Sequence, residues 1–151
     1  MTARTLITTL LLALVALAEG RSIESITLAR LKSAPLKYDG KTVHITGWLT
    51  SGHVGVFVYD EAKQNSVRVR AAEEVPRISK SQLKQDKAYA EFWRLSDHEI
   101  SKDAHPGVYV ELQAVVRVLK TAGKPAKEFS VLGQFPIELV PMRVLRIESR
   151  P

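Results

Sequence analysis

The clearest constraint on the fold is an unbroken alternation of apolar side chains near the middle of the chain. Apolar residues occupy every second position there: Val108, Val110, Leu112, Ala114, Val116 and Val118. A period of two places all six on one face of a β-strand, whereas a helix would spread them around its axis. The segment predicts a long strand with one face in an apolar core.

Three shorter segments upstream show the same period: residues 41–50, 54–59 and 66–71. Turn residues at 51–53 and a polar stretch at 60–65 separate them, and links this short predict an antiparallel meander. The expected inward side chains are Val43, Ile45, Gly47 and Leu49, then Val54, Val56 and Val58, then Val67, Val69 and Ala71. The meander and the long strand together predict a sheet with one apolar face.

The spacing becomes helical between residues 73 and 97. Three large side chains follow one another at i, i+3 and i+4: Tyr89, Phe92 and Trp93. They predict a helix with one apolar face, for which Ser81 is a candidate N-cap. A shorter helix is expected over residues 22–37, ending near Pro35. Its apolar positions are Ile23, Ile26, Leu28 and Leu31.

The order of these elements predicts the fold class. Three strands are followed by a helix, by the long strand and, after a connection at 120–136, by a final stretch at 137–149. This is the order of an OB-fold, in which a helix lies between the third and fourth strands. We expect a mainly β protein with small α content: a five-stranded OB-like barrel with an extra N-terminal helix. Another small β-barrel or an α+β sheet is the alternative.

The first twenty residues have the pattern of a signal peptide. Arg4 precedes an uncharged apolar run at 6–18, which closes with Ala16-Leu17-Ala18. A run of this length falls short of the roughly 20 residues that span a bilayer, and small residues before a cleavage site are typical of secretory signals. We expect residues 1–18 to be removed after Ala18, leaving a single OB-like domain at 19–151 in the periplasm or outside the cell.

Composition limits the possible partners. The chain has no cysteine, so neither a lipid anchor nor a disulfide framework is expected, and no transmembrane segment is expected in the mature chain. Arg4 is the only charged residue before position 19, so the net charge falls from +6 to +5 on removal of the signal. This charge favours acidic glycans, phospholipid headgroups, acidic envelope proteins or extracellular DNA, while export disfavours intracellular nucleic acid.

The opening of the mature chain resembles that of a loose group of uncharacterised bacterial periplasmic or secreted proteins with OB-like barrels. The resemblance rests on Ser25, Leu31, Pro35, Tyr38-Asp39-Gly40-Lys41, Val43, Ile45 and Gly47, and continues at Gly107-Val108-Tyr109-Val110 and Val144-Leu145-Arg146-Ile147. These fixed points are a turn, a strand glycine and apolar spacing. They imply an architecture and no chemistry, because one fold hosts many functions.

The outward positions of the first three strands form the candidate site. We expect three aromatic side chains and two arginines to gather there: Trp48, Phe57, Tyr59, Arg68 and Arg70. Aromatic rings stack on bases or sugars, and guanidinium groups pair with phosphate or carboxylate. Three lysines of the last connection could close over this face: Lys120, Lys124 and Lys127. Alternatively, Trp48 and Phe57 pack beneath a helix and the arginines are solvated.

Signals for catalysis are weak. Gly40-Lys41-Thr42 matches the end of a phosphate-binding loop, but Pro35 stands where that motif needs glycine and a strand follows. Residues 97–105 hold the only grouping of histidines and carboxylates that could suggest a metal site, and a solvated polar loop explains them better. We assign no catalytic residue, metal or cofactor.

Two functions are therefore expected ahead of an enzyme. The first is a non-catalytic binding module for an extended anionic or sugar-like ligand. The second is a protein–protein interaction module, such as an envelope adaptor or an inhibitor.

Overall fold

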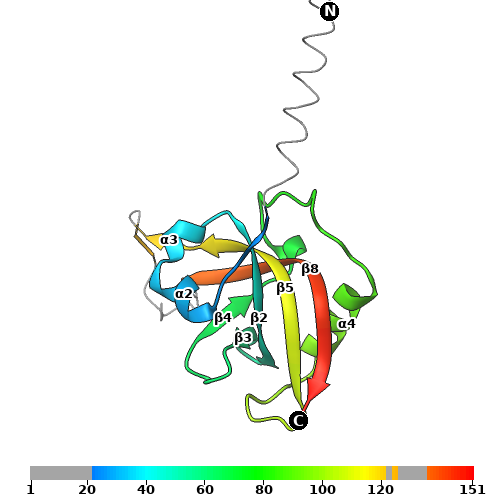
Figure 1. Cartoon of the computed structure of the whole chain (residues 1–151). Helices are drawn as coiled ribbons and strands as arrows, with labels where there is room; N and C mark the ends of the chain where they lie inside the picture. Colours follow the sequence, from blue (N-terminus) through cyan, green and yellow to red (C-terminus); the bar gives the residue numbers. More distant parts are fainter. Residues whose placement is uncertain (1–21, 122–123, 126–135) are drawn as a thin grey trace, which may run out of the picture.

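The computed structural model describes residues 22–121, 124–125 and 136–151, and it is mainly β with few helices (Figure 1). The strands of the main sheet are β1 (Glu24–Ser25), β2 (Thr42–Gly52), β3 (Gly55–Tyr59), β4 (Ser66–Val69), β5 (Gly107–Val118) and β8 (Ile137–Arg150). A small second sheet pairs β6 (Lys120–Thr121) with β7 (Lys124–Pro125). The helices are α2 (Leu28–Ser33), α3 (Pro35–Tyr38), the 3-10 turn η1 (Ala72–Glu74) and α4 (Lys87–Ser96).

The main sheet is mixed and has the strand order β1-β2-β3-β4-β8-β5, with β2 also paired to β5. Five strands therefore hydrogen-bond in a closed circuit, and the parallel contact of β4 with β8 completes it. With α4 between β4 and β5 along the chain, this order is OB-like. The sheet has six strands instead of the predicted five, because Glu24 and Ser25 add a short parallel strand beside β2.

The core lies inside this circuit and contains most of the predicted inward side chains. Val43, Ile45 and Leu49 of β2 are buried against alternate residues of β5. Tyr89 and Phe92 of α4 join the same core, and α4 packs against β8 while α2 and α3 lie on the other side of the barrel (Figure 1). The alternation in the sequence thus predicted most of the inner face of the barrel correctly.

A second apolar cluster lies on the outside of the barrel. Ala72 and Val75 pack there with Val140 and Met142 of β8, and Val115 of β5 joins them. The segment that follows β4 therefore crosses the outer face of β5 and β8 before α4 begins. Ser81 lies in this segment, so the prediction that it is the N-cap of α4 is wrong. The N-cap is Asp86, whose side chain accepts a 3.1 Å hydrogen bond from the backbone N–H of Tyr89.

The N-terminal helix is shorter and more broken than predicted. Residues 24–25 are extended, α2 begins after Thr27, and Ala34 separates α2 from α3. The side chain of Thr27 accepts from the backbone N–H of Arg30 at 3.1 Å, which fixes the start of α2. Proline at position 35 disfavours helical backbone at residue 34, so the helical pattern divides there.

The hairpin between β2 and β3 also differs from its prediction. Gly52 pairs with Gly55, so residues 53–54 form the turn and Val54 is 72% exposed instead of inward. Gly55 has φ +122°, a conformation that favours glycine, which explains why the turn ends there. β4 ends at Val69, two residues before the predicted end, so Arg70 follows the strand.

Candidate functional site

Trp48 lies at the centre of an aromatic corner on the outer face of β2. It faces Tyr59 on β3 and Tyr109 on β5, and the rings of Trp48 and Tyr109 meet edge to face with centroids 5.7 Å apart. Its indole N–H donates to Oε2 of Glu61 at 2.6 Å. Gly107 lies directly against the ring, because a Cβ there would fall 2.7 Å from Cζ3 of Trp48. The indole is therefore packed and hydrogen-bonded within the protein.

Tyr59 is covered, although its position in β3 faces outward. Its hydroxyl donates to the carbonyl oxygen of Lys102 at 2.7 Å, and the side chain is 4% exposed. The ammonium of Lys102 lies 5.8 Å from the centre of the Tyr59 ring. Burial raises the pKa of Tyr59. The expected exposure of Tyr59 is thus wrong, because the loop that precedes β5 covers this corner of the barrel.

Phe57 and Arg68 lie together elsewhere on the outer face. They are direct partners in the antiparallel register of β3 and β4, and both are half-buried. Arg68 is in turn the register partner of Glu138 on β8. The predicted cluster is therefore divided. Trp48 and Tyr59 belong to the aromatic corner, whereas Phe57 and Arg68 lie in line with Glu138 of β8.

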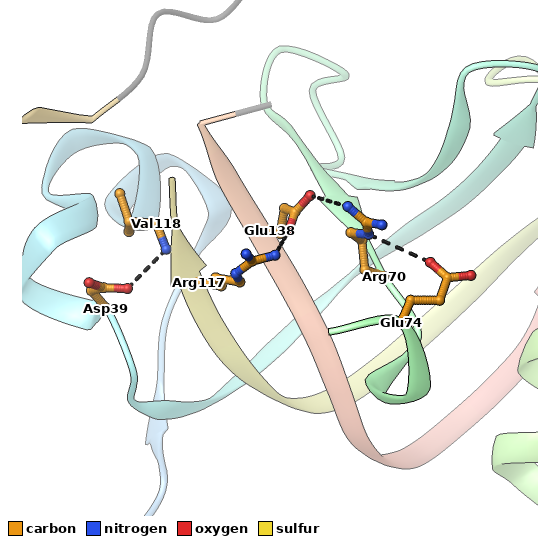
Figure 2. Close-up of polar contacts among 6 residues, drawn as sticks. All are labelled: Asp39, Arg70, Glu74, Arg117, Val118 and Glu138. Atoms are coloured by element: carbon orange, nitrogen blue, oxygen red, sulfur yellow. Dashed lines mark hydrogen bonds and ion pairs between the residues drawn. The ribbon is translucent and has the colours of Figure 1, made fainter. Parts of the chain in front are cut away.

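Glu138 is a buried carboxylate between two arginines (Figure 2). Its side chain is 1% exposed, with Nη1 of Arg117 at 3.0 Å from one oxygen and Nη1 of Arg70 at 3.4 Å from the other. Arg70 also has its Nε 3.5 Å from Oε2 of Glu74. A buried carboxylate needs such partners, because an unpaired charge in the protein interior is costly.

These contacts define an arginine row, the outward residues Arg68, Arg70, Glu138 and Arg117. It crosses β4, β8 and β5, because Glu138 is the register partner of both Arg68 and Arg117. The sequence prediction missed Arg117 and Glu138. Arg117 alternates with the core residues of its strand, which signals an outward position, but no local pattern indicates that β8 lies between β4 and β5.

Of the three predicted lysines, the structure describes the side chain of Lys120, and it lies against Asp39. Lys120 lies with its Nζ 2.5 Å from Oδ2 of Asp39, and the other carboxylate oxygen of Asp39 accepts from the backbone N–H of Val118 (Figure 2). Burial acts to raise the pKa of Asp39, but these two hydrogen bonds hold the pKa below its ordinary value. Lys124 lies in β7, and Lys127 lies outside the described residues.

Histidines and carboxylates do not form a metal centre in the described part of the chain. No group of three or more such side chains there has a geometry that could hold a metal ion. In residues 97–105, Asp103 is instead paired with Lys63 at 2.6 Å. In the same described ranges, no helix has both the length and the apolar character needed to cross a membrane.

Comparisons with known proteins add little beyond the fold. No protein-family model and no curated protein matches the chain. A solved structure of a Leishmania major Friedlin protein described as an aspartyl-tRNA synthetase is 18% identical over 87% of this chain, with a TM-score of 0.48; the chain spans only 22% of that protein. The OBody AM3L09, solved bound to hen egg-white lysozyme, is 17% identical over 76% of this chain and 88% of its own, with a TM-score of 0.43.

Proposed function

We propose that this chain is an exported, non-catalytic OB-like binding module that holds an extended anionic or sugar-like ligand along the arginine row. The observation that carries the proposal is the register that places four outward side chains side by side on adjacent strands: Phe57, Arg68, Glu138 and Arg117. An aromatic ring followed by guanidinium groups along one line suits a linear ligand with acidic groups.

The ion pairs within the row prepare the arginines for binding. Glu138 holds Arg70 and Arg117 in place through one nitrogen of each, and a guanidinium has five N–H donors. The other donors can therefore meet a ligand without losing the contact to Glu138. The arginine row has three positive guanidinium groups, and the carboxylates beside them are those of Glu74 and Glu138. These five side chains together carry one excess positive charge.

Export through residues 1–18 sets the class of ligand in this proposal. Outside the cytoplasm, the extended polyanions within reach include acidic glycans. OB-folds bind oligonucleotides and oligosaccharides on the outer face of their second and third strands, which correspond here to β3 and β4. Phe57 and Arg68 lie on that face, so the proposal centres on them.

The test is binding of a heparin oligosaccharide, an extended sugar chain rich in acidic groups, measured by isothermal titration calorimetry. We expect Arg68→Gln to weaken binding about tenfold, the value of one charge-assisted hydrogen bond. The affinity should also fall steeply as salt is raised, because the contacts are ionic.

Arg94→Gln is the matched control. Arg94 lies on the exposed side of α4, and within the described residues its ion pair is with Glu91 of the same helix. Its substitution therefore removes the same charge at a place away from the row. Equal affinity of the two variants would contradict the proposal. The proposal would also be contradicted by a protein partner that binds stoichiometrically, stays bound at high salt and binds Arg68→Gln equally well. That result would favour the protein-interaction alternative.

A further inference from the structure

A groove opens on the outer face of β5, directly beyond Arg117. It is a hollow of about 390 Å³ between the barrel and the chain segment 75–82. Its polar lining is Asp39, Thr42, Arg77, Ser79, Ser81, Gln82 and Arg117, and the carboxylate of Asp39 is paired with the ammonium of Lys120. Val75 and Val115 supply an apolar part of the wall. A hollow of this size and mixed lining is typical of a small-ligand site.

The groove continues past Gln82. A second hollow of about 460 Å³ shares Gly40, Thr42 and Gln82 with the first and extends to Lys41 and Glu24. The side chains of Thr42 and Gln82 meet at the junction, with Oγ1 donating to Oε1 at 3.3 Å. The amide of Gln82 is thereby oriented with its NH₂ group available for a ligand.

Arg77 is the unusual residue of this lining. Its φ of +63° is left-handed, a conformation that residues with a Cβ seldom adopt. Its side chain is exposed, and it forms no ion pair or hydrogen bond with any residue in the ranges that the structure describes. Position 77 thus carries an arginine where glycine or asparagine would fit the backbone better, and its guanidinium group is open to a ligand in the groove.

We infer that the groove binds an anionic sugar unit, with its oxyanion between Arg77 and Arg117 and its hydroxyl groups on the serines and Gln82. Guanidinium groups pair with phosphate or carboxylate in two parallel hydrogen bonds. Hydroxyl and amide side chains supply both donors and acceptors for the hydroxyl groups of a sugar. The inference rests on the proposed function, because the groove adjoins the arginine row through Arg117 and would receive one unit of the extended ligand.

The test titrates the purified protein with glucuronate, glucose 6-phosphate, inorganic phosphate and glucose. We expect both anionic sugars to bind more tightly than phosphate, which lacks the hydroxyl groups, and than glucose, which lacks the charge. The tighter of the two anionic sugars identifies the oxyanion as carboxylate or phosphate. Equal binding of glucose and the anionic sugars would overturn the inference.

Arg77→Gly gives the sharpest variant. It removes the charge and suits the left-handed backbone, so the protein should stay at least as stable while affinity for the anionic sugars falls about tenfold or more. Lys63→Gly is its control, because Lys63 is an exposed cation with φ +56° outside the groove. Unchanged affinity in Arg77→Gly, or an equal loss in Lys63→Gly, would overturn the inference.

Failure of the groove and failure of the proposed function give different results. If only the groove assignment is wrong, the affinity for heparin falls in Arg68→Gln and is unchanged in Arg77→Gly. If only the extended site is wrong, the anionic sugars still bind in an Arg77-dependent way, and the heparin oligosaccharide gains no affinity from Arg68.

Discussion

The aromatic corner and the arginine row occupy equivalent outward positions on the same barrel, yet they differ in how their polar groups are used. In the aromatic corner, Trp48 donates its indole hydrogen bond to Glu61, and Tyr59 donates its hydroxyl hydrogen bond to the carbonyl oxygen of Lys102. In the arginine row, Arg70 and Arg117 each use one nitrogen on Glu138 and remain about a third exposed. An outward position in a strand therefore does not by itself make a side chain accessible. Its accessibility depends on whether another segment of the chain covers the strand at that point.

The difference has a physical cause. Aromatic rings contribute most when they are removed from water, whereas a guanidinium group keeps a large hydration free energy and costs more to bury. The loop before β5 supplies Tyr59 with a carbonyl acceptor and places the ammonium of Lys102 near its ring, which suits the aromatic corner. The arginine row carries its own counter-ion in Glu138, which holds the guanidinium groups in place and leaves them accessible.

The largest effect is expected from removing both partners of Glu138. The double variant Arg70→Met, Arg117→Met leaves a carboxylate that is 1% exposed without either ion pair. We expect the free energy of unfolding to fall by about 3–5 kcal/mol, measured by urea unfolding at neutral pH.

Adding Glu138→Met to that double variant is the control, because a well-packed apolar triad removes the unpaired charge. The triple variant should recover most of the lost stability. A double variant as stable as the unmodified protein would show that Glu138 does not depend on these arginines, and the comparison of the two regions would lose its basis.

A smaller effect is expected in the aromatic corner from Gly107→Ala. The new methyl group would lie 2.7 Å from Cζ3 of Trp48, so the indole must shift, at a cost of about 1–3 kcal/mol in the free energy of unfolding. Gly52→Ala is the control, because nothing lies within 4 Å of a Cβ at that position. Urea unfolding followed by tryptophan fluorescence measures both. Equal stability of the two variants would mean that the corner is loosely packed.

Much of the fold could be predicted because its signals are local. The alternation of residues 108–118 predicts β5 and its inner face from spacing alone, and the apolar stripe of Phe92 and its neighbours predicts α4. β1 could not be predicted, because two residues carry no period. Val54 was misplaced because the turn lies at residues 53–54 instead of 51–53, whereas Val56 and Val58 keep their predicted inward side.

The candidate site was harder to predict because its partners are distant in sequence. The cover of Tyr59 comes from Lys102, and the hydrogen bond joins residues 43 positions apart. Arg70 and Glu138 are 68 positions apart and meet only through the parallel pairing of β4 and β8. Residue type and period predict that an arginine faces outward, but only the strand order determines which carboxylate it meets.

The most direct test is an NMR titration of the ¹⁵N-labelled protein with a heparin oligosaccharide, observing the side-chain N–H signals of arginine and tryptophan. We expect the Nε–H signals of Arg68 and Arg117 to shift, while the indole N–H signal of Trp48, held by Glu61, keeps its position. If the Trp48 signal shifts most and the two arginine signals stay fixed, the ligand binds at the aromatic corner, which would contradict binding along the arginine row.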